Sequence, residues 1–157
     1  MTPPDDLSGP HDGFDLAVAL VLAPRLPPDR LTVVRDYPPE HAALARVRET
    51  PEGPVAERFE LYWGPLELAN GYQELTDPAE QRRRFEAANA ARRAAGRLAW
   101  PLDGRFLAAL EAGMPPAAGV ALGLDRVLMR LAGAESLAEV MPFADDYPVV
   151  EQGRDEP

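Results

Sequence analysis

Three glutamates lie within an aromatic-rich segment, "FELYWGPLELANGYQEL", which spans residues 59–75: Glu60, Glu67 and Glu74. The segment has the composition of β-strands, and glutamate is depleted in strands. A carboxylate on a half-buried surface needs a cation, an ammonium group or a backbone donor as its partner. The residue types therefore indicate a surface that binds positively charged species.

A hairpin would bring two of these glutamates together. If Gly64-Pro65 forms a two-residue turn, Tyr62 faces Glu67, and Glu60, Tyr62, Glu67 and Ala69 share one face of the sheet. Glu60 and Glu67 are then diagonal neighbours, about 7 Å apart at Cα. Two carboxylates at that range repel each other unless a cation lies between them. Oxygen ligands of this kind suit Mg²⁺, so the pair predicts a magnesium site.

The Asn70-Gly71 pair extends this interpretation. Glycine accepts positive φ, and a bulge here would reverse the faces of the following side chains. Tyr72 and Glu74 would then join the face that carries Glu67. Spacing alone leaves an alternative open and favours it: an ordinary solvated sheet face with a routine Asn-Gly turn.

A second group of residues lies in "GVALGLDR", residues 119–126. A strand of small residues leaves room for a flat ligand, and Gly123 lets the backbone turn into a helix. Arg126 falls in the first helical turn, where its charge opposes the helix macrodipole, so it could hold a phosphate there. The alternative is a plain strand–helix junction in which Arg126 is solvated or paired with Asp125.

Composition limits the possible functions. A chain of 157 residues fits one domain. The 26 acidic and 16 basic residues, all of the latter arginine, give a net charge of -10, which argues against a nucleic-acid module with a broad basic surface. A local basic patch or a basic protein partner stays possible. The absence of cysteine excludes disulfides, thiol catalysis and cysteine-ligated zinc.

The chain predicts a cytoplasmic protein without membrane contact. No secretory signal pattern begins the sequence, and the apolar run at residues 16–24 is too short to span a bilayer. We expect a disordered lead-in at residues 1–13, one core at 14–147 and an acidic tail at 148–157.

The fold class that we expect is α+β, a mostly antiparallel sheet flanked by helices. Asp77, Pro78 and Glu80 predict a helix start with an N-cap, a proline at the first position and a capping-box acid. The arginines of that helix are expected on a solvated face. The other expected elements are a helix from 12 to Pro24, a buried strand at 31–38, hairpin strands at 59–63 and 66–70, helices at 78–96 and 102–116, and a strand before Gly123 with a helix to Gly133.

Three segments together resemble a known family: "ERFELYWGPLELANGYQEL", "TDPAEQRRRF" and "FLAALEAGMPPAAGVALGLDRVLM". They are similar to the C-terminal half of the class II aminoacyl-tRNA synthetase core, in its lysine branch. Within that branch they resemble the paralogues that attach a lysine-type amino acid to elongation factor P. The resemblance covers Pro38 to Phe143, and "GLDR" is similar to the family's motif 3. It implies ATP and Mg²⁺ as cofactors and elongation factor P or tRNA as acceptor.

The resemblance also implies a role for each matching residue. Glu60 and Glu67 would hold the magnesium bound to ATP. Asn70 and Tyr72 would line the amino-acid pocket, and Glu74 would receive the ammonium group of the lysine side chain.

Arg126, with Gly123, would contact ATP as the catalytic residue of motif 3. Nothing in the 157 residues resembles motif 1, which forms dimers, or motif 2, whose arginine binds the α-phosphate.

Three hypotheses follow. The first is a lysyl-synthetase-type ligase completed by a complementing chain, a homodimer or a longer product. The second is a non-catalytic lysine- or nucleotide-binding module. The third, a degenerate fragment, is disfavoured by the joint presence of the site residues.

Overall fold

The structure is a computed structural model that describes residues 12–143, so nearly all of the expected lead-in and the whole expected tail at 148–157 lie outside the described residues. The chain forms two compact units, divided between Ala121 and Leu122.

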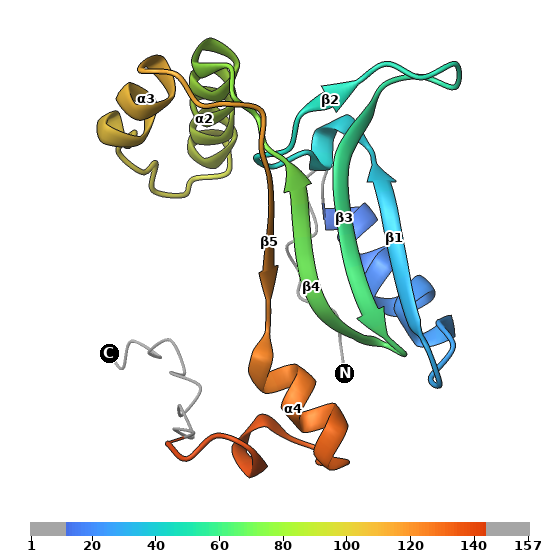
Figure 1. Ribbon diagram of the computed structural model, residues 1–157. Coiled ribbons are helices and arrows are strands. Elements are labelled where there is room, and N and C mark those ends of the chain that lie inside the picture. Colours follow the sequence, from blue (N-terminus) through green and yellow to red (C-terminus); the bar gives the residue numbers. More distant parts are fainter. Residues whose placement is uncertain (1–11, 144–157) are drawn as a thin grey trace, which may run out of the picture. The chain divides into compact units, whose positions relative to one another are not determined.

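The first unit holds a sheet with helical segments before and after its central hairpin (Figure 1). This arrangement confirms the predicted α+β class. The elements are α1 (Asp12–Ala17), a π-helical turn η1 (Val18–Leu22), η2 (Ala23–Arg25), β1 (Leu31–Tyr37), η3 (Pro39–His41), β2 (Val47–Arg48), β3 (Val55–Trp63), β4 (Leu66–Gln73), α2 (Pro78–Ala94), α3 (Gly104–Glu111) and β5 (Ala118–Leu122), whose last residue opens the second unit.

The sheet has the order β1-β3-β4-β5, and β2 pairs with β3. Strand β3 is antiparallel to β1, β2 and β4. The hairpin turn is at Gly64-Pro65 as predicted, with Tyr62 opposite Glu67. Gly64 has φ 57°, a left-handed conformation that favours glycine.

The bulge in β4 is not where the sequence predicted it. After the pair Tyr62–Glu67 the next pair is Leu61–Ala69, so Leu68 is the extra residue, and the expected bulge at Asn70-Gly71 is wrong. Leu68 is 5% exposed, which shows that the bulge packs an apolar side chain into the protein.

Gly71 has a different task from the one predicted. It lies inside β4, opposite Phe59. A Cβ at this position would lie 2.5 Å from the Phe59 ring and 2.8 Å from the Gly119 carbonyl oxygen. Gly71 therefore permits close packing between neighbouring strands.

The expectation that β1 is buried is wrong for one of its faces. Alternate residues of a strand point to opposite sides of the sheet. Val34 packs against the core formed by Tyr37, Ala42 and Ala56. Leu31 and Val33 point the other way and are 56% and 57% exposed.

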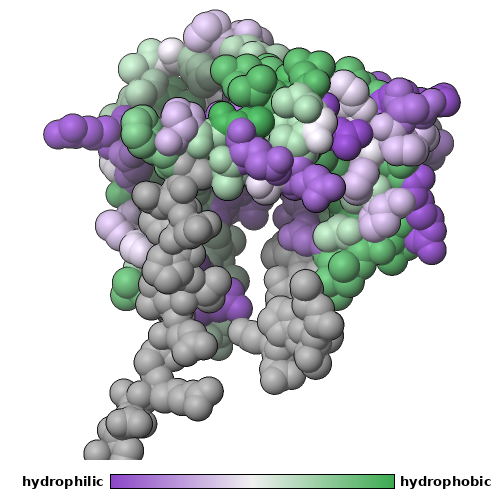
Figure 2. Space-filling view, turned by 90° about the horizontal axis from the view of Figure 1, so that it is seen from below, coloured by the Kyte–Doolittle hydropathy of each residue, from purple (hydrophilic) through white to green (hydrophobic). Residues whose placement is uncertain are grey.

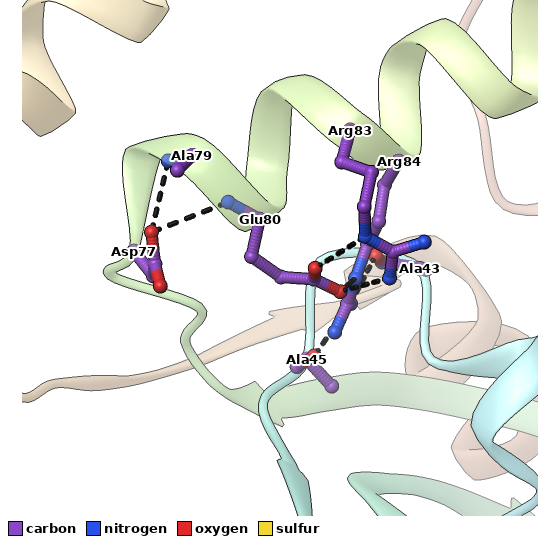
Figure 3. A network of polar contacts seen from close by, with 7 residues as sticks. All are labelled: Ala43, Ala45, Asp77, Ala79, Glu80, Arg83 and Arg84. Atoms are coloured by element: carbon purple, nitrogen blue, oxygen red, sulfur yellow. Dashed lines mark hydrogen bonds and ion pairs between the residues drawn. The ribbon is translucent and has the colours of Figure 1, made fainter.

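Helix α2 begins as predicted, because the Asp77 carboxylate accepts hydrogen bonds from the backbone N–H groups of Ala79 and Glu80. The capping-box role of Glu80 is wrong. Its carboxylate instead binds the guanidinium groups of Arg83 and Arg84 (Figure 3). Hydrogen bonds from Arg83, which have the larger effect, and from Arg84 lower the pKa of Glu80 to about 2.

Arg84 also corrects the expectation of a solvated arginine face. Its guanidinium donates to the carbonyl oxygens of Ala43, at 3.0 Å, and Ala45, at 2.8 Å (Figure 3). These bonds attach α2 to the loop before β2. Helix α3 packs on α2 through Phe85 and Phe106, whose ring centroids are 6.0 Å apart.

The second unit contains α4 (Leu124–Ala132) and η4 (Leu137–Glu139). As predicted, Gly123 precedes α4 and Gly133, with φ 67°, ends it. Its leucines are exposed, Leu124 by 70% and Leu131 by 69%. Figure 2 shows hydrophobic residues (green) beside hydrophilic ones (purple) at the surface. None of the helices within residues 12–143 is long and apolar enough to cross a membrane.

Candidate functional site

The register of the hairpin puts the predicted site residues of unit one on a single face, whereas Ala69, which was expected on this face, lies opposite Leu61 on the other one. Opposite residues of an antiparallel pair share a face, and the structure pairs Tyr62 with Glu67 and Glu60 with Asn70. The one-residue bulge between these two pairs keeps Glu67 and Asn70 in phase although they are three positions apart. Tyr72, opposite Arg58, lies on the same face. Glu74 is two positions further along the strand, so its side chain also points to this face.

Glu60 is the most enclosed acid of this face, at 7% exposed. Its Oε1 accepts a hydrogen bond from the Arg58 guanidinium, and its Oε2 accepts one from the Tyr62 hydroxyl. Arg58 is itself fixed by the His41 carbonyl oxygen at 2.9 Å and by the Tyr37 ring, whose centroid is 4.6 Å from the guanidinium carbon. Both oxygens of Glu60 therefore have partners and a set orientation.

The tyrosines beside Glu60 are held in their neutral form. Burial first, and then the Glu60 carboxylate, raises the pKa of Tyr37 and of Tyr62 well above the usual value. The hydroxyl of Tyr62 thus remains a hydrogen-bond donor to Glu60 at all physiological pH values.

Glu60 and Glu67 line one cavity of about 320 Å³, which confirms that the fold brings them together. Asp15, Ala19 and Ala23, from the helical segment before β1, form its opposite wall. Within residues 12–143 no group of three histidine or acidic side chains could hold a metal ion. Two carboxylates fit magnesium, which usually keeps several waters and takes phosphate oxygens as further ligands.

A second cavity, of about 360 Å³, is lined by Asn70, Tyr72 and Glu74 together with Gly119–Ala121 of β5. The Oδ1 atom of Asn70 is buried without a hydrogen-bond partner, which is costly unless a ligand supplies a donor. A Cβ at Gly119 would collide with the Glu74 carboxylate. Glycine at 119 therefore makes the space that Glu74 occupies.

Gly123 and Arg126 belong to the second unit. Gly123 occupies the N-cap position of α4 and adds no side-chain cap. Arg126 is exposed in the first turn of that helix. The predicted placement of this arginine at a helix N-terminus is confirmed, and its contact with ATP stays a prediction.

Sequence reasoning did not assign roles to Arg58, Tyr37 or Gly119. Arg58 lies two residues before Glu60, so it shares a face with this glutamate, and this spacing was a usable signal. Gly119 was noticed only as part of a small-residue strand. Tyr37 gave no signal, because it comes from β1 and reaches the site only in the folded chain.

Comparison with known proteins gives the family. Residues 22–147 match the model of "tRNA synthetases class II (D, K and N)". The chain belongs to this family. The match includes every predicted site residue from Glu60 to Arg126, and the resemblance drawn from the sequence is confirmed.

Curated relatives extend the likeness to the lysine branch. The chain is 48% identical over 134 residues to "Elongation factor P--(R)-beta-lysine ligase" of Klebsiella pneumoniae (strain 342), covering 85% of this chain and 41% of the relative. The protein of the same name from Edwardsiella ictaluri is 48% identical over 133 residues, with the same coverage. That from Enterobacter sp. (strain 638) is 46% identical, again covering 85% and 41%. The chain thus spans about two fifths of the length of these relatives.

Proposed function

We propose that this chain forms the amino-acid pocket and part of the ATP site of a ligase that activates lysine or a lysine-like amino acid. The activated amino acid would pass to elongation factor P, with tRNA as the alternative acceptor, in the cytoplasm. The observation that carries the proposal is the single sheet face with Glu60, Glu67, Asn70, Tyr72 and Glu74. The names of the relatives support it.

The cavity at β4 and β5 suits a substrate with a terminal ammonium group. Glu74 offers a carboxylate to that cation, and Asn70 offers a buried oxygen that has no partner within the protein. Tyr72 supplies an aromatic wall along the substrate's methylene chain. A site built around a polar partner rejects an analogue that lacks it far more strongly than an apolar pocket rejects a missing methylene.

The first cavity suits the phosphate end of ATP with its magnesium ion. Bound magnesium would neutralise phosphate charge. Glu67 is the accessible ligand, whereas Glu60 would give up Arg58 or Tyr62 as a partner before it could bind the ion. In the second unit, the family resemblance gives Arg126 its own role: it would bind ATP as the catalytic residue, beside the backbone N–H groups that follow Gly123.

The test compares lysine, β-lysine, norleucine and aspartate by ligand-observed NMR. We expect lysine or β-lysine to bind and norleucine not to, and Glu74→Gln to remove most of this preference. Glu86→Gln, an exposed change on α2, serves as the control and should leave the ranking intact. Equal binding of norleucine and lysine would refute the lysine pocket.

A non-catalytic lysine-binding module is the second candidate. The observation that favours it is Glu60, whose two oxygens are already engaged. Electrostatic stabilisation at a reacting phosphate contributes about 3–4 kcal/mol per donor, and no matching motif 2 arginine occurs in this sequence. We therefore expect the pure chain to bind lysine without catalysing lysine-dependent ATP–pyrophosphate exchange. Robust ATP–pyrophosphate exchange by the pure chain would instead favour a chain that activates lysine without any other component.

A further inference from the structure

The helical pair α2–α3 and its connecting loop form a basic region in an acidic chain. Seven of the 16 arginines lie between residues 82 and 105, where there are only two acids, Glu86 and Asp103, although the whole chain has a net charge of -10. Local charge of one sign attracts partners of the other sign and speeds their association.

The loop between the two helices has a fixed conformation. Asn89, which is 8% exposed, donates from Nδ2 to the Trp100 carbonyl oxygen at 2.8 Å. Its Oδ1 accepts from the Trp100 backbone N–H at 3.0 Å. Arg92 donates to the Leu98 carbonyl oxygen at 2.7 Å, and its guanidinium lies 5.4 Å from the centroid of the Trp100 ring.

This conformation presents apolar side chains to solvent. Leu98 is 71% exposed and Trp100 is 60% exposed. Arg93, Arg97 and Arg105, which belong to the same helix–loop–helix segment, are also exposed. Within the described residues no acidic side chain pairs with Arg93 or Arg105. Exposed apolar groups held in place beside arginine are typical of the centres of protein interfaces.

The same region is tied to the amino-acid pocket. Helix α2 follows Glu74 along the chain, and β5, which supplies Gly119, follows α3, so in the sequence both helices come between the two strands that line this pocket (Figure 1). Arg84 donates to the carbonyl oxygen of Ala45 (Figure 3). Ala45 in turn forms an isolated antiparallel bridge with Glu74. A partner bound on the helices would therefore keep a defined position relative to Glu74.

We propose that the surface formed by Arg93, Arg97, Leu98, Trp100 and Arg105 docks the acceptor protein of the proposed reaction. The matching patch on that protein would be an apolar pocket with an acidic rim. The identity of the partner rests on the proposed function, whereas the chemistry of the surface does not. A protein fits better than RNA, because Leu98 offers no plane for base stacking and Arg92 already covers part of the Trp100 ring.

The experiment measures binding of purified elongation factor P from Klebsiella pneumoniae to the full 157-residue chain by calorimetry. Arg93→Glu with Arg105→Glu should weaken binding at least tenfold, and so should Trp100→Ala. The matched control, Arg30→Glu with Arg35→Glu, makes the same charge change at side chains that are 67% and 76% exposed. It should change the Kd less than twofold. Circular dichroism would verify that each variant is folded.

Three outcomes would overturn the proposal. The first is no binding of elongation factor P by the unaltered chain. The second is an equal loss in the control and the Arg93/Arg105 variant. In the third, Trp100→Ala or the double variant does not weaken binding of elongation factor P. It instead reduces self-association of the chain, measured by sedimentation, or binding of a 20-nucleotide single-stranded RNA. Lysine binding, measured separately, keeps the two proposals apart: a chain that binds elongation factor P but not lysine refutes only the pocket.

Discussion

The acidic face of β3 and β4 and the basic helix α2 concentrate opposite charges by different means. On the sheet, the acids point into cavities, and Glu60 is held by two hydrogen-bond donors. On the helix, Arg84 turns inward to backbone carbonyl oxygens, whereas Arg93 remains exposed. Charge on the sheet is thus positioned for ligands, and charge on the helix is divided between anchoring the helix and meeting solvent.

The largest effect should come from the packing that aligns the sheet face. Gly71→Ala should destabilise the chain by about 1–3 kcal/mol, because the new Cβ meets the Phe59 ring and the Gly119 backbone. Urea unfolding measures the change. Gly104→Ala is the control, since nothing lies within 4 Å of its Cβ position. Equal effects of the two substitutions would show that the close strand packing is not limiting.

The anchoring role of Arg84 predicts the next effect. Arg84→Met should cost about 1–2 kcal/mol, because it leaves the Ala43 and Ala45 carbonyl oxygens without this charged donor. Arg83→Met should destabilise the chain much less, since the Arg83 side chain is 70% exposed and its ion pair is screened by solvent. Thermal denaturation of the two variants measures the difference. Coinciding curves for Arg84→Met and Arg83→Met would show that Arg84 does not anchor α2.

The sheet acids should show their effect in ligand binding rather than in stability. Glu67→Gln should weaken magnesium-dependent ATP binding about tenfold, or about 1.4 kcal/mol, with little change in unfolding. Calorimetric titration with and without magnesium measures it, with Glu86→Gln as control. Unchanged affinity in the Glu67 variant would remove the first cavity from the proposed ATP site.

The smallest effect concerns the pH dependence of stability. The pKa of Glu80 is about 2 in the folded chain, against 4.5 as its ordinary value. A lowered pKa means that its ion pairs stabilise the fold above about pH 4.5 and that this contribution is lost as the pH falls towards 2. Surface ion pairs contribute at most about 1 kcal/mol. Glu80→Gln should therefore flatten the stability profile slightly between these pH values; an unchanged slope would contradict the assignment.

Local signals in the sequence predicted much of this fold. The Gly64-Pro65 turn, the Asp77 cap and the glycines beside α4 act through neighbouring residues, and each was confirmed. The bulge at Leu68 was missed because its position depends on where an apolar side chain finds a packing space. The anchoring bonds of Arg84 were missed because their acceptors lie about forty residues away in the chain.

In the candidate site, too, features that depend on neighbouring residues were predicted and features that depend on distant residues were not. The co-facing of Glu60 and Glu67 was predicted from the turn. Tyr72 and Glu74 were predicted to join them through a bulge, but this bulge was expected at Asn70-Gly71 and lies at Leu68. The need for glycine at 119 could not be predicted, because it arises from a carboxylate on another strand. The roles of Gly123 and Arg126 remain predictions from the family resemblance.

The extra residue in β4 also sets a rule for insertions and deletions. Loss of Leu68 would leave Glu67 and Asn70 two positions apart. In a regular strand, side chains two positions apart point to the same face, so both would still share one face of the sheet. Loss of Gln73 has no such compensation, because it would turn Glu74 to the opposite side of the sheet. The strand can therefore lose one residue between Glu67 and Asn70 and keep both side chains on one face, but after Gly71 only an even change in length keeps Glu74 on that face.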